Sequence, residues 1–140
     1  MATDEDSPRA IISRLLTGNP RAAVDTSIEV LELLANSLVG MIGEQGFETL
    51  LYRSSHRVNL DFPWLLYDPR TRPADPEFNQ LRDCFDGQSV TQAHGASELL
   101  LTTLIEILAV LIGEYMTMLI VQPALNRASA RNHRKEQDNG

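Results

Sequence analysis

The chain has 140 residues, a formal net charge of −7 and one cysteine. A chain of this length can fold as one domain without disulfides or a structural metal, and the single Cys84 excludes an intramolecular disulfide. The negative charge argues against nucleic-acid binding, because it repels phosphate groups. We expect a cytoplasmic protein, since the acidic N-terminus lacks the basic and apolar regions of a secretory signal.

The first half of the chain predicts a short helix followed by a long one. Ser7–Pro8 marks the start of the short helix, because Ser is a favoured N-cap and Pro fits the first helical position. This helix ends at Thr17–Gly18. Asn19–Pro20 repeats the start signal, and apolar residues then keep a helical period to about Val58. The glycines of Gly43–Gly46 predict a kink in the long helix.

An irregular, proline-rich connection follows over residues 61–75. It is apolar enough to pack on the bundle, with Trp64 as its anchor. A partner-binding role is the alternative, because Trp, Tyr and Arg dominate the energetics of many protein interfaces. The candidates for that role are Phe62, Trp64, Tyr67, Arg70 and Arg72.

The second half of the chain again predicts a short helix and a long one. Asp75–Pro76 starts the short helix, and Asp86–Gly87 ends it. Ser89 starts the long helix, with Gln92 completing a capping box, and Pro123 marks its end. We expect residues 1–7 and 127–140 to be disordered tails.

The order of short helix, turn and long helix therefore occurs twice, over residues 8–58 and 76–122. Ile42-Gly43-Glu44 in the first copy aligns with Ile112-Gly113-Glu114 in the second. This repeat predicts a single all-α domain over residues 1–140, a four-helix bundle of two pseudo-symmetric short-long hairpins.

The repeated glycines and glutamates define a candidate site of their own. Gly43 and Gly113 would allow two helices to cross closely, while Glu44 and Glu114 cap, pair or face water. A carboxylate-bridged metal centre would need a His three residues after each Glu. Those positions hold Phe47 and Thr117, so we expect no metal and no other cofactor.

The last long helix is nearly apolar on all sides. Residues 99–121 are long enough to cross a bilayer, but they contain Glu106 and Glu114 and lack a basic flank. We therefore expect no membrane span. One small bundle can hardly cover so wide an apolar face, which predicts a homodimer or another helical partner.

Two histidines give a second class of hypothesis. His56 lies between Arg53 and Arg57 near a helix C-terminus, where the helix dipole favours cations, and the three could also bind an anion or phosphoryl group. His94 lies early in the last helix and resembles the solvent-facing histidine of histidine phosphotransfer domains. That resemblance implies a Lys-Gly pair one turn later, where this chain has Ser97–Glu98.

No phosphate-binding loop, nucleophile elbow or zinc-ligand spacing is present, and Cys84 has no activating neighbours in sequence. We expect no enzyme activity. The favoured function is a non-catalytic regulatory or adaptor module, in signalling, that acts through its apolar helix face and the segment from Phe62 to Arg72. A phosphotransfer domain using His94 or His56 is one alternative. A small-ligand sensor with a pocket near Arg53 and Trp64 is another.

Overall fold

The computed structural model describes residues 7–71, 75 and 77–138. Within these ranges the chain forms α-helices and no strand, so the prediction of an all-α helical bundle is confirmed. The α-helices are α1 (Pro8–Gly18), α2 (Ala23–Asn59), α3 (Asn79–Phe85), α4 (Val90–Ile112) and α5 (Glu114–Asp138), with a 3₁₀ turn over Pro20–Ala22. The bundle thus has five α-helices in the described part of the chain, where we predicted four. The predicted N-terminal tail lies almost wholly outside the described residues.

Side-chain caps start the helices at two of the predicted places. The Ser7 Oγ accepts a hydrogen bond of 3.2 Å from the backbone N–H of Ala10, at the start of α1. The Ser89 Oγ accepts one of 3.1 Å from the N–H of Gln92, at the start of α4. Each bond satisfies an N–H that the first helical turn leaves without a partner.

The start of α3 differs from the prediction. Asp75 accepts hydrogen bonds of 2.9 Å from the backbone N–H groups of Asn79 and Gln80, but the helix begins only at Asn79. Phe78, immediately before it, is left-handed, with φ 55°. Sequence alone placed the start at Pro76, because an aspartate followed by proline is the local start signal.

Two glycines break the long helices in nearly the same conformation. Gly43 has φ 79° and ψ 167° inside α2, and Gly113 has φ 90° and ψ 156° between α4 and α5. This region of backbone space is almost exclusive to glycine. The predicted kink in α2 is confirmed. The prediction of one continuous helix from Ser89 to Pro123 is wrong, because the chain turns at Gly113.

The last helix also extends further than predicted. α5 continues through Pro123 to Asp138, so residues 127–138 are helical where we expected a disordered tail. Pro123 is exposed. It removes one backbone hydrogen bond of the helix without ending it.

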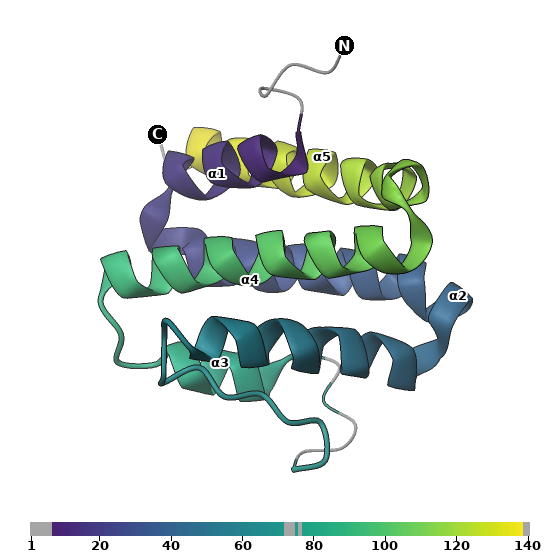
Figure 1. The fold of residues 1–140 in the computed structure, drawn as a ribbon. Coiled ribbons are helices and arrows are strands. Elements are labelled where there is room, and N and C mark those ends of the chain that lie inside the picture. Colours follow the sequence, from purple (N-terminus) through teal and green to yellow (C-terminus); the bar gives the residue numbers. More distant parts are fainter. Residues whose placement is uncertain (1–6, 72–74, 76, 139–140) are drawn as a thin grey trace.

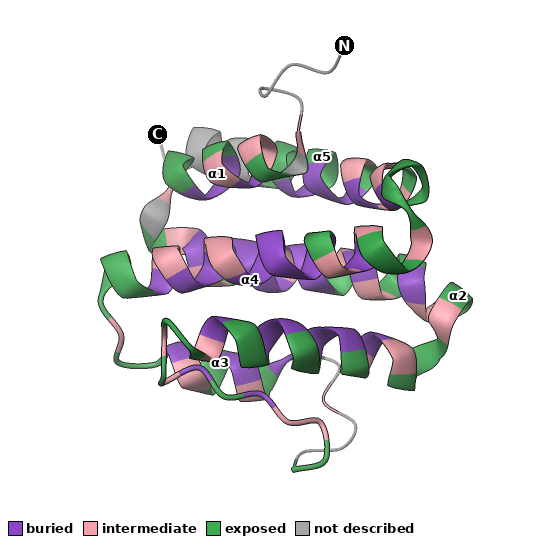
Figure 2. Ribbon diagram, in the orientation of Figure 1, coloured by how far each residue is buried: buried purple, intermediate pink, exposed green. Residues whose placement is uncertain are grey.

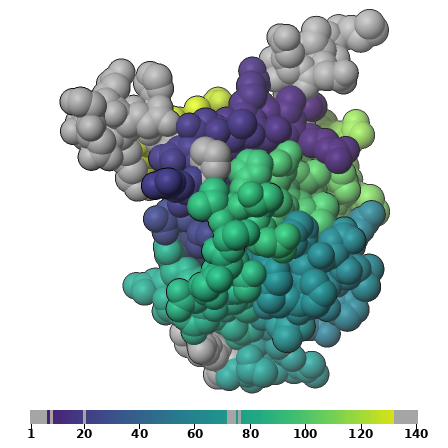
Figure 3. Space-filling view, turned by 90° about the vertical axis from the view of Figure 1, so that its left-hand side faces the viewer, coloured from purple at the N-terminus to yellow at the C-terminus, as the bar shows by residue number. Residues whose placement is uncertain are grey.

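The helices form three layers (Figure 1). α1 and α5 form one outer layer, α4 and the first part of α2 form the central layer, and the second part of α2 with α3 forms the other outer layer. The bends at Gly43 and Gly113 lie at the same end of the bundle, on the right in Figure 1. Figure 3 views the opposite end, where the start of α4 lies between α1 and the last part of α2.

The core fills the spaces between these layers (Figure 2). Leu31, Leu34 and Leu38 of α2 and Leu101 and Leu104 of α4 are fully buried at the centre. α1 adds a buried face that packs on α4 and α5. The central layer therefore carries apolar residues around much of its circumference, as expected for helices covered on both sides.

Length and composition overturn the prediction that no segment spans a membrane. Two helices, α2 and α4, are long and apolar enough to cross one. In their most apolar windows, 39% of α2 and 50% of α4 is buried inside the protein. Central helices of a bundle meet the same test, because filling a core requires similar length and apolarity. We took Glu106 and Glu114 as evidence against a span, but α4 is long and apolar enough to cross a membrane although it contains Glu106.

Candidate functional site

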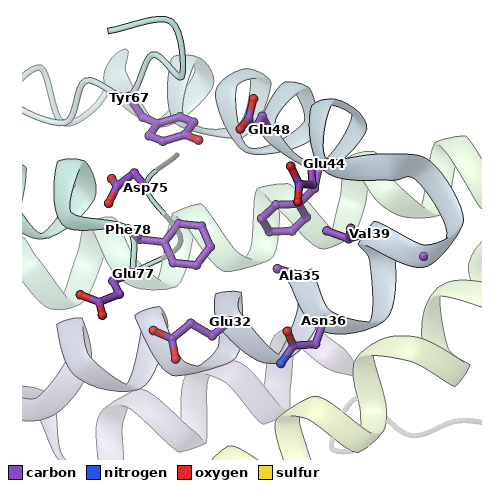
Figure 4. A pocket seen from close by; sticks show the side chains of 12 residues that line it. Glu32, Ala35, Asn36, Val39, Glu44, Glu48, Tyr67, Asp75, Glu77 and Phe78 are labelled. Carbon is purple, nitrogen blue, oxygen red and sulfur yellow. The ribbon is translucent and has the colours of Figure 1, made fainter. Parts of the chain in front are cut away.

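A cleft of about 780 Å³ opens inside the bend of α2 (Figure 4). The two arms of α2 on either side of Gly43 form its walls, and Tyr67, Asp75, Glu77 and Phe78 line it from the chain between α2 and α3. Its lining residues are Glu32, Ala35, Asn36, Val39, Gly40, Glu44, Phe47, Glu48, Tyr67, Asp75, Glu77 and Phe78. We call it the acidic cleft, because five of these side chains are carboxylates.

Aromatic side chains line part of the acidic cleft. The rings of Phe47 and Phe78 meet edge to face, with their centroids 6.1 Å apart and their planes at 62°. Both rings are buried, and so is most of Tyr67. The left-handed backbone of Phe78 places its ring between the connection and α2. The three aromatic side chains therefore form part of the wall of the cleft, with little of their surface exposed.

The carboxylates come from three parts of the chain. Glu32 lies on the first arm of α2, Glu44 and Glu48 on the second arm, and Asp75 and Glu77 just before α3. No Lys, Arg or His is present among the described residues that line the cleft. Its electrostatic potential is therefore negative, and a positively charged group is the ligand it favours.

Tyr67 responds to this negative potential. Its pKa is raised to about 12, first because the phenol is buried and then because Glu48, Asp75 and Asp68 disfavour the phenolate. Figure 4 shows Tyr67 and Glu48 on the same side of the acidic cleft. The phenol stays neutral at physiological pH and supplies a polar group beside the carboxylates.

The carboxylates do not converge on one point. In the part of the chain that the structure describes, no three His, Cys, Asp or Glu side chains are grouped closely enough to hold a metal ion. The acidic cleft therefore suits a ligand that carries several separated positive charges better than a single small cation.

A second cavity of about 350 Å³ lies between α1, α4 and α5. We call it the hydroxyl pocket, after its two unpaired threonines, Thr102 and Thr117. Its lining residues are Ser7, Arg9, Ile12, Thr102, Ile105, Glu106, Ala109, Glu114, Thr117 and Met118.

Exposed apolar side chains gather near the two glycine bends. Val110 and Tyr115, on either side of Gly113, are 85% and 76% exposed. We call this set of side chains the apolar end. It comprises Met41, Val110, Leu111, Tyr115, Met116 and Leu119.

The predicted partner-binding residues of the connection have mixed placements. Trp64 packs edge to face on Phe62 and Phe85, with centroids 5.9 and 5.2 Å away, which supports its predicted role as an anchor rather than the alternative of partner binding. Tyr67 is the member of this group that lines the acidic cleft. Arg70 is exposed and pairs with Asp68 at 3.0 Å, which lowers the pKa of that carboxyl. Arg72 lies outside the described residues.

The predicted anion-binding and phosphoryl residues do not form one site. Arg53, His56 and Arg57 are exposed on the last turns of α2, and the His56 ring stacks on Tyr52. His94 is half-buried on α4, with its Nε2 3.5 Å from the Thr17 hydroxyl. The phosphotransfer hypothesis stays a prediction. Neither Arg53 nor Trp64 lines the acidic cleft or the hydroxyl pocket. The ligand pocket predicted beside these two residues is therefore neither of the two cavities described above.

The glycines do not act as close-crossing points. A Cβ added to Gly43 or to Gly113 would meet no heavy atom within 4 Å, so no neighbouring helix approaches there. The positive φ at both positions, rather than a close helix crossing, explains why glycine is needed there. Glu44 and Glu114 follow them, are exposed, and start the next helical segments, where the helix dipole favours a carboxylate. Cys84 is half-buried, and its thiol donates to the Leu66 carbonyl.

Sequence reasoning missed most of the acidic cleft. Glu32, Glu48 and Glu77 were not candidates, although one signal was available. Glu44 and Glu48 lie four residues apart on one helical face, a like-charge pair that destabilises a helix.

No family model, curated protein or solved structure matches the chain.

Proposed function

We propose that the protein is a non-catalytic binding module, of the regulatory or adaptor kind, that takes up a basic, amphipathic segment of a partner protein. The observation that carries this proposal is the acidic cleft, which has five carboxylates and no basic side chain among its described lining residues. Charged side chains of this kind raise the association rate and select partners of opposite charge.

The shape and chemistry of the cleft support a peptide segment as the ligand. The charged heads of Arg or Lys side chains would meet Glu44 and Glu48, and their aliphatic stems would lie along the wall of the cleft. Because the carboxylates are spread along two arms of α2 and the start of α3, several basic side chains can be accommodated at once.

The apolar end supports the amphipathic character of the partner. It lies at the same end of the bundle as the bend that opens the acidic cleft (Figure 1). Val110, Leu111 and Tyr115 are exposed there without any covering element among the described residues. An exposed group of large apolar side chains on a small protein marks an interaction surface.

We further propose that the two halves of the chain descend from one duplicated unit. Three observations support it: the aligned Ile-Gly-Glu segments, the matching conformations of Gly43 and Gly113, and the positions that line the two cavities. In the alignment given by those segments, these cavity-lining residues fall on one another: Glu32 on Thr102, Ala35 on Ile105, Asn36 on Glu106, Val39 on Ala109, Glu44 on Glu114, Phe47 on Thr117, and Glu48 on Met118. The acidic cleft and the hydroxyl pocket are then two versions of one ancestral cavity.

The proposed function is tested with a defined probe. A fluorescein-labelled peptide rich in Arg and Leu, able to form an amphipathic helix, is titrated with the protein at low and high salt. We expect saturable binding that weakens with salt, and a peptide with Glu in place of Arg should not bind. Glu44→Gln and Glu48→Gln should each weaken binding roughly two- to fivefold, because a partly exposed ion pair contributes up to about 1 kcal/mol.

Glu98→Gln is the matched control, since it makes the same charge change on α4 outside the acidic cleft. Equal weakening by Glu98→Gln would mean that binding follows net charge alone and would refute the site. Static light scattering accompanies the titration. A dimer that releases its partner copy when the peptide binds would show that a second copy of the chain covers the same surface.

A further inference from the structure

A single residue connects α4 to α5. α4 ends at Ile112 and α5 begins at Glu114, so Gly113 alone makes the turn between two helices that pack on each other. Its φ of 90° and ψ of 156° lie in a region of backbone space that is almost exclusive to glycine. Rotation of this one residue into the helical region would join α4 and α5 into one straight helix. Gly113 is therefore a hinge between a helical hairpin and a single long helix.

The apolar pattern of the sequence crosses this hinge without a change of register. Six residues recur with spacings of 3, 4, 3, 4 and 4, which place them on one face of a continuous helix: Leu101, Leu104, Leu108, Leu111, Tyr115 and Leu119. We call this set the apolar stripe. Its first three residues are fully buried, whereas Leu111, Tyr115 and Leu119 are 60%, 76% and 53% exposed. The bend at Gly113 thus leaves the second half of the apolar stripe without a covering element among the described residues.

α5 packs on elements that a second copy of the chain also offers. Its contacts are with α1, α2 and α4, and Arg131 adds an ion pair of 2.6 Å with Glu29 of α2. Among the side chains that the structure describes, the buried ones of α5 are Thr117, Val121, Ala124, Leu125 and Ala128. Each of these contacts can form equally well with α1, α2 and α4 of another copy. Exchange of α5 between two copies would therefore keep the packing of this helix.

We propose that the chain binds a second copy of itself by exchange of α5. Gly113 becomes helical in both copies, α4 and α5 form one helix, and α5 packs on the second copy. Because α5 returns along α4 in the single copy (Figure 1), the two long helices of the dimer run antiparallel and cross near Gly113. Val110 and Leu111 of one copy then meet Tyr115 and Met116 of the other, so the dimer covers part of the apolar end.

This exchange goes beyond the proposed function and does not depend on it. The described residues that line the acidic cleft all precede α3, so removal of α5 to a second copy leaves that cleft intact. The carboxylates nearest to the hinge in sequence, Glu106 and Glu114, are exposed and can remain in water. A second copy suits the apolar end because the register of the apolar stripe fits a straight helix, and exchange is the arrangement that produces one.

The experiment measures the distance between two spin labels within one chain by pulsed electron paramagnetic resonance. Thr91→Cys, at the start of α4, and Ser129→Cys, in the last part of α5, carry the labels in a Cys84→Ser background, and both positions are exposed. The labelled chain is refolded at high concentration with an excess of unlabelled chain, so that a dimer rarely carries two labelled copies. Size-exclusion chromatography then separates monomer from dimer.

The two arrangements give different distances. In the monomer, the start of α4 and the last part of α5 lie at the same end of the bundle, so the labels are close together (Figure 1). In the exchanged dimer, the 38 residues from Thr91 to Ser129 form one helix. At a rise of 1.5 Å per residue, they separate the labels by about 50–60 Å. We expect the long distance in the dimer fraction and the short one in the monomer fraction.

Two changes at the hinge should move the dimer in opposite directions. Gly113→Ala should raise the association constant at least about tenfold, because alanine disfavours the bend and favours a helix. Insertion of Gly-Ser-Gly after Gly113 should abolish the dimer, because it lengthens the turn and interrupts the straight helix. Gly43→Ala is the matched control. It disfavours the same conformation in α2, but opening there would separate Leu31 and Leu34 from the rest of the core, so this variant should dimerise no more than the unaltered chain.

Three results would overturn the proposal. One is a monomer at the highest soluble concentration for both the unaltered chain and Gly113→Ala. Another is a dimer that keeps the short distance within each chain, since unchanged copies would then meet through the apolar end. The third is an equal gain in dimer from Gly43→Ala. If Gly113→Ala does not fold, the unaltered chain is compared with the insertion variant, and equal dimer formation by the two would refute exchange at Gly113.

Discussion

The indole N–H of Trp64 donates a hydrogen bond of 3.2 Å to the side-chain oxygen of Gln92. Gln92 lies in the first turn of α4, so this bond joins the irregular connection to the central layer. Phe62, the neighbour of Trp64 in the same cluster, lies so close to Gly95 that an added Cβ there would be 3.1 Å from its ring. The connection is therefore held on α4 by packing and by a hydrogen bond, and this fixes where Tyr67 enters the acidic cleft.

Replacing Trp64 with Ala should destabilise the protein by about 2–4 kcal/mol, because the ring packs on Phe62 and Phe85 and is half-buried. Urea denaturation measures the change. Leu66→Ala is the control, since Leu66 is 65% exposed in the same connection and its loss should change stability by less than about 0.5 kcal/mol. Equal effects of the two substitutions would show that Trp64 does not anchor the connection.

Alanine at either glycine bend should destabilise the protein, by about 1–3 kcal/mol each, because Gly43 and Gly113 hold a conformation that is strained for any other residue. Gly40→Ala should have the opposite effect on the free energy of unfolding. Gly40 is helical and exposed, and a Cβ there would contact nothing within 4 Å, so alanine should stabilise α2 by roughly 0.5–1 kcal/mol. Thermal or urea unfolding gives both signs, and a stabilised Gly43→Ala would contradict the observed bend.

Stability should fall as pH rises from about 10 to about 12. The pKa of Tyr67 is near 10 in the unfolded chain and is raised to about 12 in the folded protein. Its contribution is fully present below the unfolded pKa and is lost as the folded phenol ionises. Tyr67→Phe should flatten this part of the pH profile, whereas Tyr115→Phe, at a 76% exposed position, should not. Ultraviolet titration of the phenols checks the raised pKa directly.

Glu44→Gln should leave stability nearly unchanged, because it removes both the like-charge repulsion with Glu48 and the favourable interaction of the Glu44 carboxylate with the helix dipole. Glu48→Gln should stabilise the protein by a few tenths of a kcal/mol at low salt, because it removes the repulsion alone. The gain should shrink as salt is added. The same substitutions are expected to weaken peptide binding. Urea unfolding at two salt concentrations, beside the peptide titration, shows whether stability and binding move in opposite directions, as they do at functional sites.

Local signals predicted much of the helical framework. Ser7 and Ser89 cap the helices that the sequence assigned to them, and the glycines of α2 mark its kink. These features depend on neighbouring residues along the chain, so they can be read from the sequence. The capping box was only half right. The Ser89 hydroxyl caps α4, while the side-chain oxygen of Gln92 accepts from Trp64, far away in sequence.

The remaining features depend on tertiary structure. Gly113 lies in a strongly apolar stretch that the sequence predicts as one helix, where a glycine would cost only about 1 kcal/mol, so the turn at its positive φ was not predicted. Pro123 looked like a terminator, but the packing of α5 on α1 and α4 carries the helix past it. Tyr67, Asp75 and Glu48 line the same cleft because α2 bends. The periodicity of the sequence predicts helices but not which residues come together when a helix bends.

The layer formed by α1 and α5 has a consequence for synthesis of the chain (Figure 1). Ribosomes deliver residues from the N-terminus, so α1 is made long before the helix that covers one side of it. Until α5 emerges, the buried faces of Ile12, Leu15 and Leu16 have only α4 and α2 to pack against. The nascent chain therefore carries on α1 an apolar face that stays partly uncovered until α5 is made, and such surface favours aggregation while it is exposed.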